Sequence, residues 1–356
     1  MAIYSLFVLF GQSVATLLGR LYYDKGGKSK WMVTLVQSAG FPILLPFLCI
    51  SPTKDPIADN NHTEPPTALI LATVCFFLGI FLAADAMLYS IGLQYLPVST
   101  FSLICASQLA FNALFSFFLK SQKFTPYIVN SLVVITISSI LLVFQTDSSG
   151  STEISKGKYM IGFLCTVGAA AGYAFILSIT QLSFRKFLKT GTFRVVLEVI
   201  IFESLVATCA ILVGFFASGE WKSLNREMEE FGLGKLSYVM TLVWTAVAWQ
   251  VFSIGALGLI YEVSSLFCNV ISTLGLPIVP VLAVIFFHDK MNGVKVVAML
   301  SAVWGFVSYI YQHYLDDLKS KAENHENVNQ VSEASVSGLY SSHHSIVHKN
   351  KGDELM

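Results

Sequence analysis

Four acidic residues lie in or at the edge of long apolar stretches, where an ionised group is costly. Asp85 lies in the run LAADAMLY and Glu203 in the run IIFESL, while Glu198 and Glu262 lie nearer the ends of such stretches. A charge at the bilayer centre costs roughly 2.5–3.5 kcal/mol on insertion scales, so such residues pair, face a cavity or take up a proton. Because no Lys or Arg falls inside a predicted span, protonation is the natural way to lower this cost. A carboxyl group of this kind could carry a proton across a membrane together with a substrate.

Each acid also has an interpretation that involves no transport chemistry. Asp85 could be an interfacial acid near a helix end, and Glu203 could be a hydrogen-bonded contact between helices. Glu198 follows Arg194 by one helical turn, which favours an ion pair at the i,i+4 spacing. Glu262 falls in a predicted turn, where a solvated acid is expected. Asp85, Glu198 and Glu203 are therefore candidates for a proton-coupling group.

A second set of candidates consists of amide side chains well inside apolar stretches. An amide offers a donor and an acceptor side by side, which matches the edge of a purine or a similar ring. Gln108 and Asn112 share one helix face because they are four residues apart, and Trp249 could clamp the face of a ring. The candidates for substrate binding are Gln37, Gln108, Asn112, Trp249, Gln250 and Asn269. The alternatives are interhelical hydrogen bonding for the amides and core or interfacial packing for the tryptophan.

The sequence contains no motif typical of a membrane enzyme or of a metal centre. It has no HExxH or GxSxG motif, and no histidine falls in the interior of a predicted span. The six cysteines all fall in apolar stretches, and none forms a CxxC pair. We therefore predict a protein that is not an enzyme and that uses no metal or cofactor.

The composition is that of a membrane protein. The 356 residues are 54% hydrophobic and 12% charged, whereas soluble domains have about 25% charged residues. The mean hydropathy is +0.67. A soluble core of this length could not bury so much apolar surface, but a bilayer accepts it. The formal net charge of zero argues against a nucleic acid partner, which would require an excess of basic residues.

Ten apolar stretches are long enough to span a bilayer as helices, since about 20 residues suffice. They are Ala2–Gly19, Trp31–Ile50, Thr67–Gly92, Leu96–Leu119, Pro126–Phe144, Tyr159–Gln181, Val195–Ala217, Ser237–Ile260, Val263–Phe287 and Val296–Gln312. Gly275, Pro277 and Pro280 interrupt the ninth stretch and predict a break or a kink there. The polar tail from residue 318 predicts disorder.

Short motifs recur in register five predicted spans apart. Ser90-Ile-Gly and Val98-Ser-Thr in the first half correspond to Ser253-Ile-Gly and Val263-Ser-Ser in the second. Five is an odd number, so the second copy would be inverted in the membrane, as in many secondary transporters. We therefore predict an all-α polytopic membrane protein with a 5+5 inverted repeat. Its parts would be a first five-helix repeat over 1–150, a second over 151–317 and a disordered tail over 318–356.

The orientation in the membrane is left open by the positive-inside rule. The loops on the two sides hold equal numbers of Lys and Arg when the tail is included. Asn61-His-Thr is a glycosylation sequon in the second loop, and it would be used only if that loop faced outside.

Several long runs of residues resemble the plant purine permease family of the drug/metabolite transporter superfamily. They include LLGRLYYDKGGKSKW at 17–31, VQSAGFP at 36–42, YLPVSTFSLICASQLAFN at 95–112, LVWTAVAWQVFSIG at 242–255, GLPIVP at 275–280 and FHDKMNG at 287–293. The similarity covers essentially everything but the tail. The chain departs from the family at its N-terminus, where a hydrophilic leader and a fuller first helix are usual.

The resemblance implies a fold, a function and a cellular location. It implies ten helices in a 5+5 repeat, both termini in the cytosol and, most commonly, the plasma membrane. It implies proton-coupled uptake of adenine, cytokinins and related nitrogen heterocycles. An acidic residue at the position of Glu198 resembles the family pattern, whereas an acidic residue at the position of Glu203 is not usual. The resemblance therefore favours Glu198 as the proton-coupling group. The expected partners are a heterocyclic small molecule, a proton and the lipid bilayer.

Two alternatives remain open at this point. An uncoupled facilitator or exporter of alkaloid-like nitrogen heterocycles would use the same architecture without a proton. A membrane receptor for a cytokinin-like ligand would bind without transmembrane flux, although the sequence lacks a sizeable soluble signalling domain.

Overall fold

The computed structural model describes residues 1–50, 68–120, 156–187, 193–275 and 278–288, with scattered residues in 126–133 and 293–315. Most of the fifth predicted span, much of the tenth, the loop with the sequon, Pro277 and the tail lie outside the described residues. The chain divides into two compact units, Met1–Phe306 and Val307–Met356, and every helix named below belongs to the first.

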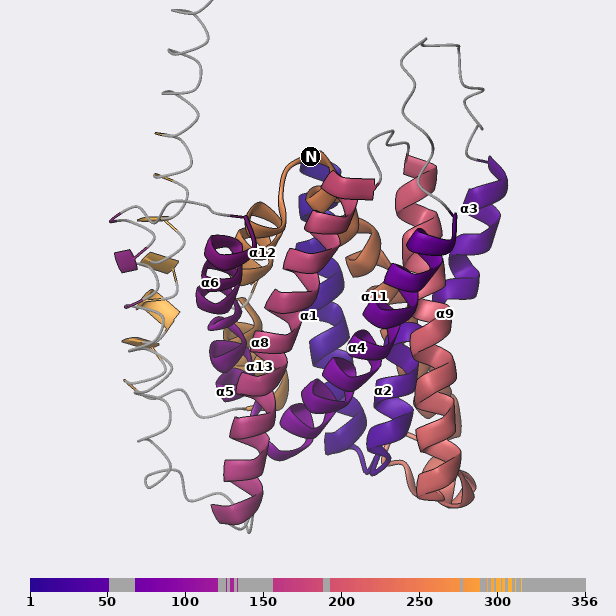
Figure 1. Cartoon of the computed structure of the whole chain (residues 1–356). Helices are drawn as coiled ribbons and strands as arrows, with labels where there is room; N and C mark the ends of the chain where they lie inside the picture. The colour runs from indigo at the N-terminus through magenta and orange to yellow at the C-terminus, as the bar shows by residue number, and fades with distance from the viewer. Residues whose placement is uncertain are drawn as a thin grey trace, which may run out of the picture. The chain divides into compact units, whose positions relative to one another are not determined.

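The described residues of this first unit form helices and no strands (Figure 1). The helices are α1 (Ala2–Asp24), α2 (Lys30–Ser38), η1 (Phe41–Leu44), α3 (Leu45–Ile50), α4 (Ala68–Tyr95), α5 (Val98–Cys105), α6 (Gln108–Lys120), α8 (Lys156–Phe187), α9 (Phe193–Ser218), η3 (Glu220–Ser223), α10 (Leu224–Glu230), α11 (Lys235–Glu262), α12 (Ser265–Gly275) and α13 (Ile278–Phe287).

Eight segments of the described chain are long and apolar enough to cross a membrane. They are Ala2–Asp24, Lys30–Cys49, Ala72–Tyr95, Val98–Leu119, Lys156–Lys186, Phe193–Ser218, Lys235–Glu262 and Ser265–Phe287. They coincide with the first four predicted spans and with the sixth to ninth. The expectation of an all-helical polytopic membrane protein is thereby confirmed.

Large apolar side chains point outward from these segments. Phe118 and Val213 are each 71% exposed, and Leu236 is 77% exposed. In water such surfaces would promote association, whereas lipid chains solvate them. The exposed apolar faces therefore fit a membrane environment.

Two of the predicted spans are interrupted within the described residues. The second consists of α2, η1 and α3, with Pro42 in the first turn of η1. The fourth is divided at Ala106–Ser107 into α5 and α6. Neither interruption was expected from the sequence, and the break expected in the ninth span, between α12 and α13, lies outside the described residues. Interrupted helices free backbone groups, which in a membrane are tolerated where they are buried in protein or face a cavity.

The first helix is longer than predicted and carries a basic residue. The prediction ended it at Gly19, but α1 continues to Asp24. Arg20 donates to the carbonyls of Leu93 (3.1 Å) and Leu96 (2.9 Å) at the end of α4, and it pairs with Asp24 at 2.9 Å. The cation stabilises the free carbonyls and the negative end of the α4 dipole. The expectation that no span contains a Lys or Arg is therefore corrected at this position.

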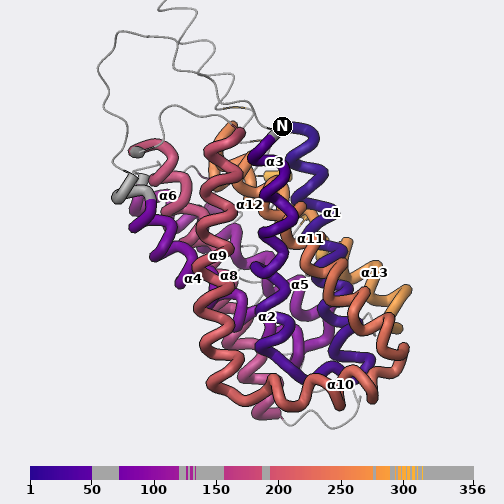
Figure 2. The backbone as a smooth tube through the Cα atoms, turned by 90° about the vertical axis from the view of Figure 1, so that its right-hand side faces the viewer, coloured from indigo at the N-terminus to yellow at the C-terminus, as the bar shows by residue number. Residues whose placement is uncertain are grey.

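Two long helix pairs dominate the packing, α1 with α11 and α4 with α8 (Figures 1 and 2). Gly11 of α1 lies against the α11 backbone, and an added Cβ would come within 2.6 Å of the Phe252 nitrogen. Gly255 of α11 lies equally close to the α1 backbone at Tyr4 and Val8. Glycine therefore allows α1 and α11 to approach each other closely, as small residues do in membrane helix interfaces.

Candidate functional site

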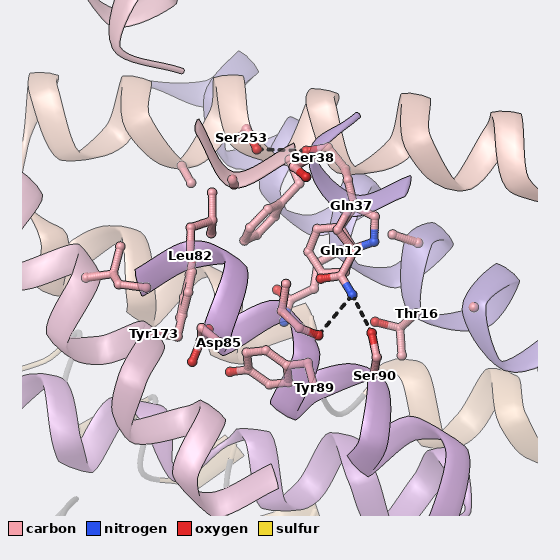
Figure 3. A pocket seen from close by; sticks show the side chains of 18 of the residues that line it. Gln12, Thr16, Gln37, Ser38, Leu82, Asp85, Tyr89, Ser90, Tyr173 and Ser253 are labelled. Atoms are coloured by element: carbon pink, nitrogen blue, oxygen red, sulfur yellow. Dashed lines mark hydrogen bonds between the residues drawn. The ribbon is translucent and has the colours of Figure 1, made fainter. Parts of the chain in front are cut away.

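A cavity of about 130 Å³ lies among helices α1, α2, α4, α5, α6, α8, α9 and α11. A single water needs roughly 10–15 Å³ of such space, so the cavity has room for a small ligand or for a group of waters. Its wall is mostly apolar but includes amides, hydroxyls and two carboxyl groups (Figure 3). A mainly apolar pocket with a few converging polar groups is typical of a small-molecule site.

Asp85 lines this cavity from the middle of α4 and is 5% exposed. Its Oδ1 has no hydrogen-bond partner, and it lies so close to Gly172 of α8 that an added Cβ would be within 2.4 Å of it. Tyr89, one turn further along α4, and Tyr173 of α8 line the same part of the wall (Figure 3). Asp85 is therefore a buried cavity residue and not an interfacial acid.

Glu203 lines the cavity from α9 and is also 5% exposed, with an Oε1 that has no hydrogen-bond partner. The backbone of α9 approaches α4 at Gly79, whose Cβ, if present, would lie 2.8 Å from the Glu203 carbonyl oxygen. The described residues that line the cavity include no Lys, Arg or His. Both carboxyl groups therefore lack a cationic partner within the lining.

The other two acids lie elsewhere. Glu198 accepts a hydrogen bond from Arg194 Nε at 3.0 Å, and its side chain is 40% exposed. Glu262 pairs with the N-terminal amine of Met1 at 2.8 Å. Neither residue lines the cavity. This geometry matches the surface interpretations that their positions near helix ends suggested.

Gln37 is an amide that reaches the cavity from α2. Its Nε2 donates to Ser90 Oγ at 3.0 Å and to the Ala86 carbonyl at 3.4 Å, as Figure 3 shows. Ser90 Oγ also accepts from Thr34 Oγ1 at 2.8 Å. These bonds connect α2 to α4 and hold the amide of Gln37 at the cavity wall.

Gln108 also lines the cavity, at the start of α6, and it belongs to a chain of polar groups. Its Nε2 donates to Ser272 Oγ at 3.1 Å, and Ser272 donates to Gln12 Oε1 at 2.6 Å. Asn269 Nδ2 donates to the Gln108 carbonyl at 3.0 Å. The chain connects α6, α12 and α1, and Gln12 lines the cavity at its far end.

Three of the predicted substrate residues lie in helix contacts outside the cavity lining. Asn112 donates to the Ser265 carbonyl at 3.0 Å and accepts from Ser178 at 2.8 Å. Gln250 lies against Ser38 of α2, 3.5 Å from its carbonyl, and Asn269 contacts Gln108 as described. In these places each amide connects two helices, which is the alternative that the sequence left open.

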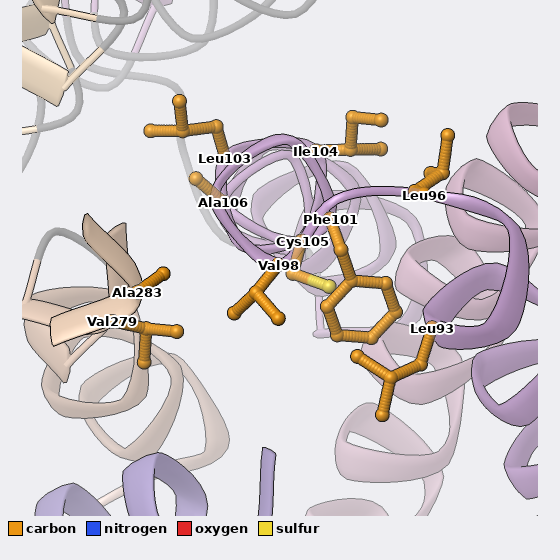
Figure 4. Close-up of a cluster of buried hydrophobic side chains, with 10 residues drawn as sticks. All are labelled: Leu93, Leu96, Val98, Phe101, Leu103, Ile104, Cys105, Ala106, Val279 and Ala283. Atoms are coloured by element: carbon orange, nitrogen blue, oxygen red, sulfur yellow. The ribbon is translucent and has the colours of Figure 1, made fainter. Parts of the chain in front are cut away.

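Aromatic side chains form other parts of the wall. Trp249 of α11 is half-buried and packs edge-on against Phe252 with ring centroids 5.4 Å apart. On the side of α5, Phe101 and Cys105 line the cavity and belong to a buried cluster with Leu93, Val98, Val279 and Ala283 (Figure 4). This cluster packs α5 against α13 beside that part of the cavity wall.

Several cavity residues were not selected from the sequence. Tyr173 and Ser90 are hydroxyl residues of a kind that is common in membrane helices, and no spacing distinguishes them. Gln12 was also not selected, and the structure places it in the cavity wall, where its Oε1 accepts a hydrogen bond from Ser272.

Comparison with known proteins shows the family of the chain. A model of the family described as purine nucleobase transmembrane transport matches residues 1–319. The chain belongs to the purine permease family. It is 58% identical over 328 residues to probable purine permease 10 of Arabidopsis thaliana, covering 91% of this chain and 83% of that relative. It is 59% identical over 323 residues to purine permease 21 of the same plant, with the same two coverages.

Membership in the purine permease family fixes the general class of the protein. Its relatives are named permeases, so the chain is a transporter and not an enzyme. The eight apolar segments place it in a membrane as a multi-pass protein. A small heterocyclic molecule is the kind of substrate that the family implies.

Proposed function

We propose that this purine permease imports purine nucleobases and derivatives such as adenine and cytokinins, together with a proton. The observation that carries this function is the cavity, which combines two partner-free carboxyl groups with amides and an aromatic side chain. A planar ring would lie against Trp249, and its polar edge would meet Gln37 or Gln108. The transport would take place at the plasma membrane, with both termini in the cytosol.

The proton would bind a carboxyl group of the cavity. Asp85 and Glu203 have the geometry for this role, since each lines the cavity and has a buried oxygen without a partner. Protonation removes the cost of an ionised group that lacks a counter-charge. Glu198 remains a prediction from the resemblance, but its ion pair with Arg194 gives it less support.

Alternation of access would arise from two inverted repeats of five helices. In such a repeat, α1 corresponds to α8, and α4 corresponds to α11. The symmetry would therefore convert the contact between α1 and α11 into the contact between α8 and α4. These are the two most extensive helix contacts of the described chain. This observation supports a 5+5 repeat, in which substrate sites lie between the repeats.

Uptake of radiolabelled adenine tests this function. The full chain would be expressed in a yeast strain without its own purine permease, and uptake would be measured at acidic and near-neutral external pH, with and without a protonophore. We expect saturable uptake that rises at acidic pH and collapses with the protonophore. Uptake indifferent to both would indicate the uncoupled facilitator, and binding without flux would indicate a receptor.

A further inference from the structure

The cavity contains two buried carboxyl groups, whereas symport of one proton needs one. Asp85 and Glu203 both have an oxygen without a hydrogen-bond partner, and the described lining offers no basic side chain to either. The protein can change the side to which a loaded cavity opens at low energetic cost only when the charges inside the cavity are neutralised. Two carboxylates therefore require two positive or hydrogen-bond-donating partners, of which the proton supplies one.

The two groups lie at different depths. The Glu203 backbone lies level with Gly79 of α4, and Asp85 is six residues further along the same helix. At 1.5 Å per residue this separates the two backbone positions by about 9 Å along α4. The two side chains enter the cavity from different helices and at different levels, so each can have its own partner.

Glu203 lies near the aromatic wall. Ile200 of α9 belongs to a buried cluster against which Ile254 and Leu257 of α11 pack. Further along α9, Thr208 donates to Ser38, the residue whose carbonyl also faces Gln250. The helices α9 and α11 therefore run in opposite directions. Glu203, between these two levels, lies within about one turn, roughly 5 Å, of the depth of Trp249 and Ser253.

The surroundings of Glu203 suit a planar ligand. Ser204, Ala207 and Ser253 line the cavity around it and are small, and the indole ring of Trp249 also lines it. A carboxylate accepts paired N–H donors from an amidine-like edge, as it does from a guanidinium. An aromatic face attracts a flat cation in addition.

Asp85 is more closely surrounded by the protein itself. Its Oδ1 lies against the backbone of Gly172, and Tyr89 and Tyr173 line the wall beside it (Figure 3). The contact with α8 covers this oxygen on the side of Gly172, so a proton can reach it more easily than a ring. A charge at this place acts directly on the α4 and α8 interface.

We propose that Glu203 binds the cationic or N–H-rich edge of a planar nitrogen heterocycle, while Asp85 takes the transported proton. This assignment rests on the proposed function and names the substrate class of the same cavity: neutral rings with paired N–H donors and flat organic cations. Anionic rings are excluded, since the lining has carboxylates and no cation to receive them.

Benzamidine and benzamide test the role of Glu203, because they have nearly the same shape and differ in charge. Their binding is measured by the thermal stabilisation of the purified full chain in detergent, and their inhibition of adenine uptake is measured in yeast. We expect wild type to prefer benzamidine by about tenfold or more, as for charge-assisted pairs. Glu203→Gln should reduce this preference to about onefold, and the matched control Glu198→Gln on the same helix should keep it.

The outcomes separate this assignment from the function that it refines. A wild type that transports adenine but shows no preference for benzamidine overturns the assignment and leaves the function intact. A preference that disappears in Glu203→Gln, in a chain that moves no adenine, supports the assignment and overturns the function. A preference that is unchanged in Glu203→Gln also overturns the assignment.

A measurement on wild type covers the case in which Glu203→Gln does not reach the membrane. A hydrophobic carbodiimide labels buried carboxyl groups, and mass spectrometry locates the label. We expect benzamidine, but not benzamide, to protect Glu203 more strongly than Asp85. Equal protection of both residues, or no protection of Glu203, would contradict the assignment.

Discussion

Glu227 is a buried acid outside the cavity, and its surroundings explain why it is tolerated there. It is 5% exposed and accepts hydrogen bonds from the hydroxyls of Tyr22 and Tyr238, the latter at 3.2 Å. These two residues come from α1 and α11, so the carboxylate of α10 joins both helices at one end of the pair. Hydrogen bonds to a charged group contribute about 1.5–3 kcal/mol each.

Replacing Glu227 by Ala should therefore destabilise the protein. Two buried hydroxyls would lose their acceptor, and we expect the free energy of unfolding to fall by about 2 kcal/mol or more. Thermal unfolding of the purified chain in detergent provides the measurement. Glu229→Ala is the control, because Glu229 lies on the same helix, is 62% exposed and pairs only at the surface with Lys235. Equal effects of the two substitutions would contradict this role.

Asp85 and Glu198 are expected to differ in their effect on transport, because only Asp85 lines the cavity. Asp85→Asn keeps the shape of a cavity residue but removes the group that we assign to the proton, so acid stimulation of adenine uptake should be lost by about tenfold or more. Glu198→Gln should keep it, since Glu198 is paired with Arg194 near a helix end. The readout is the ratio of uptake at acidic and near-neutral pH, normalised to surface expression. A loss in Glu198→Gln with a normal Asp85→Asn would reverse our choice of carboxylate.

Residue types alone identified part of the candidate cavity lining. Gln37, Gln108, Trp249, Asp85 and Glu203 line the cavity, and their roles in substrate or proton binding stay predictions. Helical spacing correctly placed Gln108 and Asn112 on one face of α6, but it does not tell how that face is rotated within the bundle. Gln108 reaches the cavity, and Asn112, one turn away, meets α8 and α12 instead.

At the scale of elements, the close packing of α1 on α11 depends on glycine. An added Cβ on Gly11 would lie 2.6 Å from the Phe252 nitrogen and 2.8 Å from the Ala248 oxygen, which are backbone atoms that cannot rotate away. The two helices would have to separate, and the cavity wall that they form would shift with them. Helix crossings in membranes depend on such small residues.

Gly11→Ala should consequently lower the unfolding temperature and reduce adenine uptake. We expect a cost of about 1–3 kcal/mol, as for other overpacked contacts. Gly168→Ala is the matched control on α8, because its nearest neighbour, Leu88 Cδ1, is 3.7 Å away and alanine favours a helix. A normal unfolding temperature in Gly11→Ala would show that the interface adapts.

The existence of the helices could be predicted better than their continuity. Apolar length is enough to recognise a span, and α4, α8, α9 and α11 lie where it placed them. The interruption at Ala106–Ser107 contains no proline or glycine from which it could be predicted. It depends on how α5 and α6 pack on their neighbours. Gly19 was read as a helix end, but it serves as a contact with Leu93, so α1 continues to Arg20 and beyond.

At the scale of the whole molecule, we propose that proton and nucleobase cross together through one cavity. The transporter class follows from family membership, and the apolar exterior follows from composition. In this proposal the coupling depends on a carboxyl group that is neutral when the cavity is loaded. A protein of this kind should move protons only when substrate moves.

The most direct measurement is adenine-driven proton movement in proteoliposomes that contain the purified full chain and a pH-sensitive dye in the lumen. Our account predicts that external adenine acidifies the lumen with wild type, while Asp85→Asn binds adenine but moves no protons. Adenine flux without any change in luminal pH, or proton movement that is independent of adenine, would contradict it.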